Sequence, residues 1–293
     1  MEKKKTETML GETKEKKDSD AKDVKKEELS MNEKKILVEE VLKDKNVEPL
    51  TIEALFKSGA YFGHKKSRRN PKMDEYVYSY REGVAIIDVR LTMSRIKEAL
   101  HYIDSIITSG KSILFVGTKK HVRSMVEDIA NRTGMPFINN RWLGGTFTNF
   151  SVIRERVRYF LDLEEKIQRN DFSGYTKLEK LKKREEYEKM NEKIGGLRKM
   201  DSLPGVVFIL DVKQDHLAVK EANRAGIPVV ALVDTNDTPR GVFRLIPANN
   251  DAISSIRFIL EYVAQCVEKA GEKKNSSQVK LNTDVLQEKQ SKK

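Results

Sequence analysis

The side chains best suited to bind a ligand stand in one short segment, NNRWLGGTFTN, at residues 139–149. An arginine can hold a phosphate through two N–H groups, and asparagine amides can bond phosphate oxygens, sugars or base edges. The adjacent glycines let another backbone approach closely, and no acidic residue occurs from 136 to 153. Trp142 and Leu143 are expected to anchor the segment to a core. The RNA contacts predicted in this segment are Asn139, Asn140, Arg141 and Asn149.

Cations gather in three other stretches. GHKKSRRNPKM (63–73) carries five of them within eight positions, in a loop, because Pro71 cannot continue a helix. GTKKHVR (117–123) carries three where a helix begins, and helix N-termini already attract anions. YSYREG (78–83) adds one more. A solvated loop is the alternative, but a phosphate backbone accounts for the crowded charge more economically. The residues predicted to contact RNA here are Lys65, Lys66, Arg68, Arg69, Asn70, Lys72, Arg81, Lys119, Lys120 and Arg123.

Familiar catalytic motifs are missing from the sequence, which has no GxGxxG turn, P-loop, GxSxG elbow or HExxH pair. Its four histidines stand in separate segments, and its single cysteine excludes an internal disulfide and a cysteine-based zinc site. We therefore predict no catalytic residue, no cofactor and no metal site. An enzyme acting on a phosphorylated substrate is the alternative, because Asp88, Asp211 and Asp234 follow strands, where open α/β sheets bind ligands. Carboxylates there also cap helices and tie loops.

Composition favours a polyanionic partner. The 293 residues carry a net charge of +11, and 34% of them are charged while 38% are hydrophobic. The longest apolar runs are far shorter than the roughly 20 residues that span a bilayer. The N-terminal stretch has no apolar core and is rich in acid, unlike a signal or transit peptide. We predict a soluble cytoplasmic protein with no membrane partner.

Apolar strands alternate with amphipathic helices along most of the chain, a pattern typical of an α/β fold with a parallel sheet covered on both faces. One helix is predicted at 51–59, with Thr51 as its N-cap, and another closes the domain near Gly271. The strands are predicted at 84–89, 112–117, 136–139, 205–210, 227–233 and 244–247.

Residues 152–199 interrupt this alternation with two charged helices joined by a turn. The apolar stripe of the first helix is expected to run through Val157, Leu161 and Ile167, too narrow for a core helix. The pattern predicts an inserted antiparallel coiled-coil hairpin that reaches a partner. An adaptor whose hairpin binds only proteins is therefore a further alternative.

Three segments complete the predicted organisation. Residues 1–48 form a charged, mostly disordered extension with a short helix near 31–43. The α/β domain spans 49–271 and contains the hairpin. A disordered tail occupies 272–293.

Several motifs resemble, in order and spacing, the bacterial-type second protein of the small ribosomal subunit. They are FGHKKSRRNPKM, GVAIIDVRLT, ILFVGTKK, NNRWLGGTFTNF, LPGVVFILDV, AVKEANRAGIPVVALVDTN and IPANNDAI. The resemblance covers roughly residues 50–270. It implies a Rossmann-like, flavodoxin-like sheet of about five parallel strands, and a ribosome-bound structural protein rather than a catalyst. It also implies binding to small-subunit ribosomal RNA and to neighbouring proteins, including the large messenger-binding first protein.

The chain departs from that family at two places. Arg69 stands where members usually have a tryptophan, so a phosphate contact is expected in place of a stacking contact. After VDTN the family tends toward acidic residues, whereas this chain has Thr238, Arg240, Phe243 and Arg244. A cation site built from acids in that stretch is therefore not expected.

Overall fold

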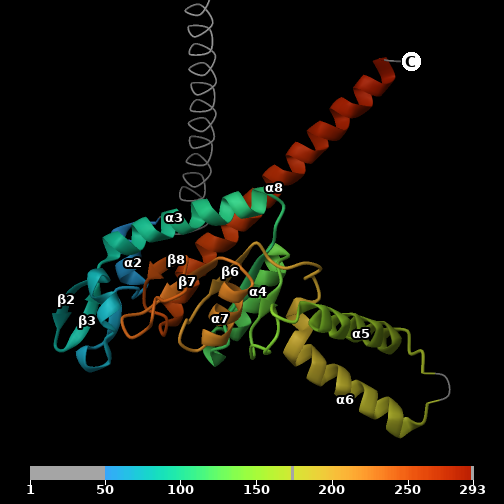
Figure 1. Cartoon of the computed structure of the whole chain (residues 1–293), viewed down its shortest axis with the longest axis horizontal. Coiled ribbons are helices and arrows are strands. Elements are labelled where there is room, and N and C mark those ends of the chain that lie inside the picture. Colours follow the sequence, from blue (N-terminus) through green and yellow to red (C-terminus); the bar gives the residue numbers. More distant parts are fainter. Residues whose placement is uncertain (1–49, 173–174, 292–293) are drawn as a thin grey trace, which may run out of the picture.

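The computed structural model describes residues 50–172 and 175–291, so the helix expected near 31–43 lies outside the described residues. Five parallel strands form the main sheet in the order β5-β4-β6-β7-β8. Figure 1 labels β6, β7 and β8 of this sheet. The predicted α/β class with a sheet of about five parallel strands is confirmed. The strands are β4 (Ile113–Val116), β5 (Phe137–Ile138), β6 (Val206–Ile209), β7 (Val229–Val233) and β8 (Arg244–Pro247).

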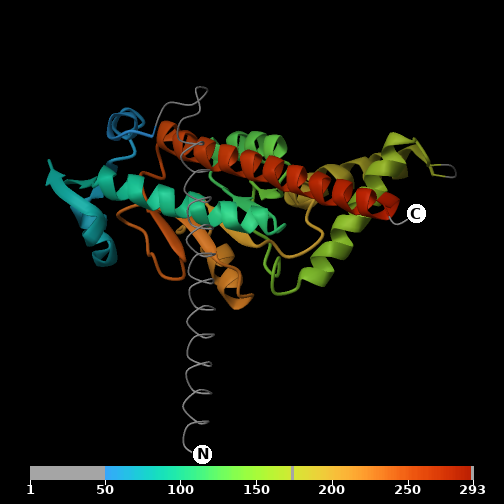
Figure 2. The same ribbon diagram turned by 90° about the horizontal axis from the view of Figure 1, so that it is seen from above.

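Alternate residues of each central strand face opposite sides of the sheet, as the pleat requires. In β4, Ile113 and Phe115 join one buried cluster, whereas Leu114 and Val116 join the other. Both faces are therefore apolar, which is why these strands read as continuous hydrophobic runs. Figure 2 shows α3 and α8 running along one face. The helices covering this first face are α3 (Val89–Thr108), α4 (Arg123–Thr133) and α8 (Ile253–Ser291); α7 (His216–Arg224) covers the other.

Helix boundaries follow local signals in the sequence. The Thr51 hydroxyl accepts a hydrogen bond from the Ala54 N–H at 3.1 Å, at the start of α2 (Ile52–Lys57), which confirms the predicted N-cap. Gly134, with φ of 71°, ends α4 in the left-handed conformation that glycine adopts without strain. A short 3-10 turn, η3 (Lys120–Val122), leads into α4.

A second, antiparallel sheet lies beside the first and has the order β1-β3-β2. The expectation that residues 84–89 form a strand of the parallel sheet was wrong. Glu82 and Gly83, both with positive φ, make a two-residue turn between β2 and β3, and so short a connection permits only antiparallel pairing. The strands are β1 (Phe62–Lys65), β2 (Val77–Arg81) and β3 (Val84–Ile87), with η1 (Lys66–Arg68) and η2 (Pro71–Tyr76) between the first two.

Two helices, α5 (Phe150–Gln168) and α6 (Lys177–Ile194), project from the body in Figure 1. The stacked rings of Phe160 and Tyr187, 5.3 Å apart, join them. Val157 is buried as expected, but Leu161 is 37% exposed, so the expected stripe on the first helix was wrong at Leu161. The buried face is set instead by contact with both α6 and the sheet; its residues are Ile153, Val157, Phe160 and Leu163.

The last helix differs from the disordered tail expected at 272–293, because α8 continues to Ser291 and leaves the body at its far end (Figure 1). After Gly271 the sequence has no glycine or proline and is rich in lysine, glutamate and glutamine, which have good helix propensity. After α6, η4 (Gly195–Leu197) leads back toward β6. No helix in the described part of the chain is long and apolar enough to cross a membrane.

Candidate nucleic-acid interface

The segment at 139–149 is held to the body by a buried carboxylate on α7. Glu221 accepts hydrogen bonds from the Trp142 indole N–H at 3.2 Å and from the backbone N–H groups of Gly145 and Phe147 at 2.8 and 3.1 Å. Trp142 is only 5% exposed and packs edge-on against Phe147. The prediction that Trp142 anchors this segment is therefore confirmed. Sequence reasoning missed Glu221, whose only signal is a carboxylate on the apolar side of a helix.

Some polar side chains of the anchored segment are free, whereas others are hydrogen-bonded within the protein. Arg141 is exposed and has no hydrogen bond or ion pair with another described residue. The Asn139 amide donates to Glu127 at 3.1 Å and the Asn140 amide donates to Glu192 at 2.7 Å, so those N–H groups are already used. Asn149 is exposed at the start of α5 and makes no capping bond. Arg141 and Asn149 are thus the two predicted contacts here with fully free side chains.

Part of this segment meets the start of α4 across a cavity of about 660 Å³. The cations Lys120, Arg123 and Arg141 line it together with Asn140. The structure thus brings together two stretches that the sequence placed apart. An open cavity with three cationic side chains can hold a phosphate group.

Asp215 lines the same cavity and is buried. Its carboxylate accepts a hydrogen bond from the Thr118 hydroxyl at 2.8 Å. Burial raises the pKa of Asp215 from its ordinary value to about 6. Two loops at the carboxyl edge of the sheet are tied together by this contact, which sequence reasoning did not foresee.

Lys119 has a different environment from its neighbours. Its side chain is 17% exposed, and its ammonium group lies 2.6 Å from Asp211 and 2.7 Å from Asp251. It also donates to the Asn250 carbonyl at 2.7 Å. The donors that an RNA phosphate would need are therefore engaged within the protein, so the geometry favours a structural role for Lys119.

The basic loop between β1 and β2 presents most of its cations to solvent, as do the ends of those strands. Arg69 pairs with Asp74 at 3.2 Å, and Lys66 lies over the Tyr80 ring at 5.4 Å. Asn70 is tied inward, because its side chain accepts from the Lys72 N–H and donates to Thr238. The exposed cations are Lys65, Lys66, Arg68, Arg69, Lys72 and Arg81.

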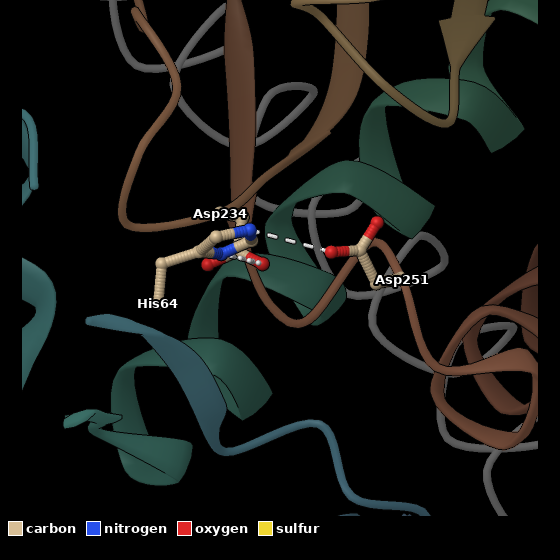
Figure 3. A group of neighbouring side chains, drawn as sticks. All are labelled: His64, Asp234 and Asp251. Carbon is tan, nitrogen blue, oxygen red and sulfur yellow. Dashed lines mark ion pairs between the residues drawn. The ribbon is translucent and has the colours of Figure 1, made fainter. Parts of the chain in front are cut away.

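His64 precedes this loop and lies between two carboxylates (Figure 3). Its Nδ1 is 3.1 Å from Asp234 Oδ2, and its Nε2 is 3.3 Å from Asp251 Oδ2. The Asp234 carboxylate raises the pKa of the imidazole, against the opposing effect of burial. Sequence spacing gave no sign of this cluster, because its members come from three distant segments.

The strand-end aspartates that favoured an enzyme are used within the fold. Asp88 accepts from the Arg90 N–H at 2.9 Å as the N-cap of α3, and its ion pair with Arg90 lowers the pKa of Asp88. Asp211 accepts from the Gln214 N–H at 2.8 Å. Asp234 accepts from the Thr235 N–H. Each carboxylate caps a helix or ties a loop, which was the structural alternative.

Comparisons with known proteins point to one family. A family model described as Ribosomal protein S2 matches residues 55–270. A protein named "Small ribosomal subunit protein uS2" from Roseiflexus sp. (strain RS-1) is 44% identical over 233 residues, covering 80% of this chain and 89% of the relative. Proteins of the same name from Chloroflexus aggregans (strain MD-66 / DSM 9485) and Geotalea uraniireducens (strain Rf4) are 42% and 39% identical. They cover 78% and 80% of this chain, and 96% and 91% of their own length.

Proposed function

The chain belongs to the ribosomal protein S2 family, and from this premise we propose that it is a structural component of the small ribosomal subunit that binds ribosomal RNA. The observation that carries the proposal is the family match over residues 55–270. Relatives named as small-subunit proteins align over most of this chain and most of their own length. A role in translation in the cytoplasm follows from that assignment.

Electrostatics support RNA as the partner. The net charge of +11 favours a polyanionic partner. Counterion release from a phosphate backbone favours binding by such cations and makes the binding salt-dependent. The proposed contact residues are the exposed or cavity-lining cations Lys65, Lys66, Arg68, Arg69, Lys72, Arg81, Lys120, Arg123 and Arg141, with Asn149.

Four of the polar residues first expected at the interface take another role in this proposal. Lys119 is bound to Asp211 and Asp251, and Asn70 caps η2. Asn139 and Asn140 donate to glutamates of α4 and α6. In this proposal all four residues position the loops. Of their side chains, only the amide oxygens of Asn139 and Asn140 remain available to accept a hydrogen bond from RNA.

We also propose that the protein contacts neighbouring proteins of the small subunit, without assigning individual contact residues. Neighbouring small-subunit proteins are expected to contact the surfaces that RNA leaves free. The projecting helices α5 and α6 offer one such surface, with Leu178 and Leu181 more than half exposed. Docking of the large messenger-binding first protein is the finer proposal, and it rests on the family resemblance.

Sedimentation tests this function directly. The full chain, carrying a small epitope tag, is expressed in a bacterial host, and lysates are separated on sucrose gradients. The tagged chain should sediment with the small subunit and stay there in moderate salt. A tagged chain confined to the top of the gradient, with folding verified by circular dichroism, would refute the proposal. That outcome would favour the enzyme acting on a phosphorylated substrate.

A further inference from the structure

A second large cavity lies beyond the carboxyl ends of β6 and β7, and none of its lining residues belongs to the contacts proposed so far. Its volume is about 940 Å³, within the roughly 300–1,000 Å³ typical of ligand pockets. Its lining residues come from 212–224 and 236–241, so it lies between α7 and the loop after β7. Open α/β sheets bind ligands at this edge. We call it the α7 pocket; its main polar residues are Lys213, His216, Lys220, Arg224, Asn236 and Arg240.

The α7 pocket is rich in unpaired positive charge. Four of its lining side chains are exposed cations: Lys213, Lys220, Arg224 and Arg240. None of the four has a hydrogen bond or ion pair with another described residue. The only carboxylate among the lining residues, Asp237, is buried, and its Oδ2 accepts from the Asn250 amide at 2.7 Å. Unpaired cations around one cavity repel each other, so they favour an anionic ligand.

Asn236 adds a requirement that a simple anion does not meet. Its side-chain Oδ1 is buried and accepts no hydrogen bond from the described part of the chain. A buried acceptor without a donor is costly, so the best ligand carries a donor as well as negative charge. A ribonucleotide has both, because its ribose hydroxyls and base N–H groups donate while its phosphate is anionic.

The α7 pocket also adjoins two groups of proposed RNA contacts. Thr238 lines the pocket and accepts a hydrogen bond at 3.0 Å from the side chain of Asn70, in the basic loop between β1 and β2. At the start of α7, His216 lines the pocket, whereas the next residue, Leu217, lines the cavity that holds Arg141. An RNA strand that contacts the basic loop or Arg141 is therefore close enough to place a nucleotide here.

We propose that the α7 pocket binds one nucleotide of ribosomal RNA. A ribose hydroxyl or base N–H donates to Asn236, and the phosphates on either side contact Arg224 and Arg240. This inference rests on the proposed function and adds to it a site that recognises a nucleotide as well as backbone charge. A free nucleotide has the same chemistry, and an acidic protein has the same charge, so the experiment separates both from RNA.

The first test removes charge from the pocket of the full chain. Arg224→Ala with Arg240→Ala should lower affinity for small-subunit ribosomal RNA about tenfold and flatten the slope of log affinity against log salt by about two at most. The urea midpoint should stay unchanged, because both side chains are exposed and unpaired among the described residues. Lys111→Ala with Arg257→Ala removes two exposed cations outside the pocket and should leave the slope at its wild-type value.

The second test removes the neutral acceptor. Asn236→Ala should lower RNA affinity about fivefold, the effect of one lost hydrogen bond. The salt slope should not change, because the amide is uncharged. The urea midpoint should not fall, because Asn236 Oδ1 has no donor within the described chain. A lower urea midpoint with wild-type RNA affinity would instead assign Asn236 a structural role and overturn its part in the site.

Photocrosslinking with ribosomal RNA that contains 4-thiouridine locates the contact directly. Crosslinks should fall on peptides from 212–224 or 236–241. If wild type binds RNA but crosslinks only elsewhere, or if Arg224→Ala with Arg240→Ala binds like wild type, the nucleotide site is overturned and the proposed function stands. Failure of wild type to bind ribosomal RNA would count against the proposed function itself.

Competing ligands decide between the sources of the same chemistry. Nucleoside 5′-monophosphates, titrated by calorimetry, should bind much more weakly than RNA, because they lack the neighbouring contacts. Tighter binding of a monophosphate than of RNA would reassign the pocket to a free nucleotide and overturn the proposal. Displacement of RNA by polyglutamate of equal charge, as effectively as by unlabelled RNA, would show that the pocket recognises only charge and would overturn it too.

Discussion

The Trp142 indole N–H donates to the Glu221 carboxylate at 3.2 Å, inside a loop whose next residues also bind that carboxylate. One buried group on α7 therefore shapes the turn that carries Arg141 to the surface. Arg141 and Trp142 are adjacent in the sequence but have separate roles.

Trp142→Ala should lower the free energy of unfolding by about 3–5 kcal/mol, because it removes a large buried side chain. The indole donor to Glu221 is lost as well. Urea denaturation of the purified protein measures the change. Wild-type stability in this variant, with reduced RNA binding, would mean that the ring stacks on a base instead.

Arg141→Ala should leave the urea midpoint unchanged, because the side chain is exposed and unpaired among the described residues. Affinity for ribosomal RNA should fall, and the slope of log affinity against log salt should flatten by about one at most. Fluorescence titrations over a range of salt concentrations provide both values. An unchanged slope would place the RNA contact elsewhere.

Arg68→Glu with Arg69→Glu should weaken association with the small subunit and preserve the fold. Both guanidinium groups are exposed, and the pair between Arg69 and Asp74 is solvent-accessible, so it contributes little to stability. Lys57→Glu with Lys111→Glu makes the same change in net charge away from the loop and serves as control. Equal loss of subunit association in both double variants would show that only net charge matters.

Shortening the projecting helices should be tolerated. Replacing residues 164–184 with a short Gly-Ser linker keeps Phe160 and Tyr187, so cooperative urea unfolding should persist. Deleting 154–196 instead removes Val157 and Phe160 from the buried cluster, and should cost at least about 3 kcal/mol more. Equal stability of the two deletions would show that α5 does not belong to the core.

The free energy of unfolding of Asp215→Asn, relative to that of wild type, should increase as pH rises. Burial raises the pKa of Asp215 to about 6 from 3.8, so the native state binds its proton more tightly than the unfolded state does. Stability of wild type relative to the variant should therefore fall by about 1–2 kcal/mol between pH 5 and pH 7.5. Urea titrations at both pH values, with the exposed Asp162→Asn as control, measure this. A pH-independent difference would contradict the assigned pKa.

Local features of the chain were set by the sequence alone. Apolar runs at 205–210 and 227–233 predicted β6 and β7 because a strand buried on both faces needs no polar alternation. Thr51 predicted the start of α2 because capping is a contact within one turn. The basic stretches at 63–73 and 117–123 were evident because charge can be counted along the chain.

Tertiary structure decided which of those groups are free to bind a partner. Lys119 and Lys120 are neighbours with equal charge, yet only Lys119 is enclosed by carboxylates from two distant loops. Glu221 beneath Trp142, and the cluster at His64, likewise join residues from distant segments. Burial and ion pairing depend on distance in space, which local sequence patterns do not encode, so these assignments required the folded arrangement of the sheets.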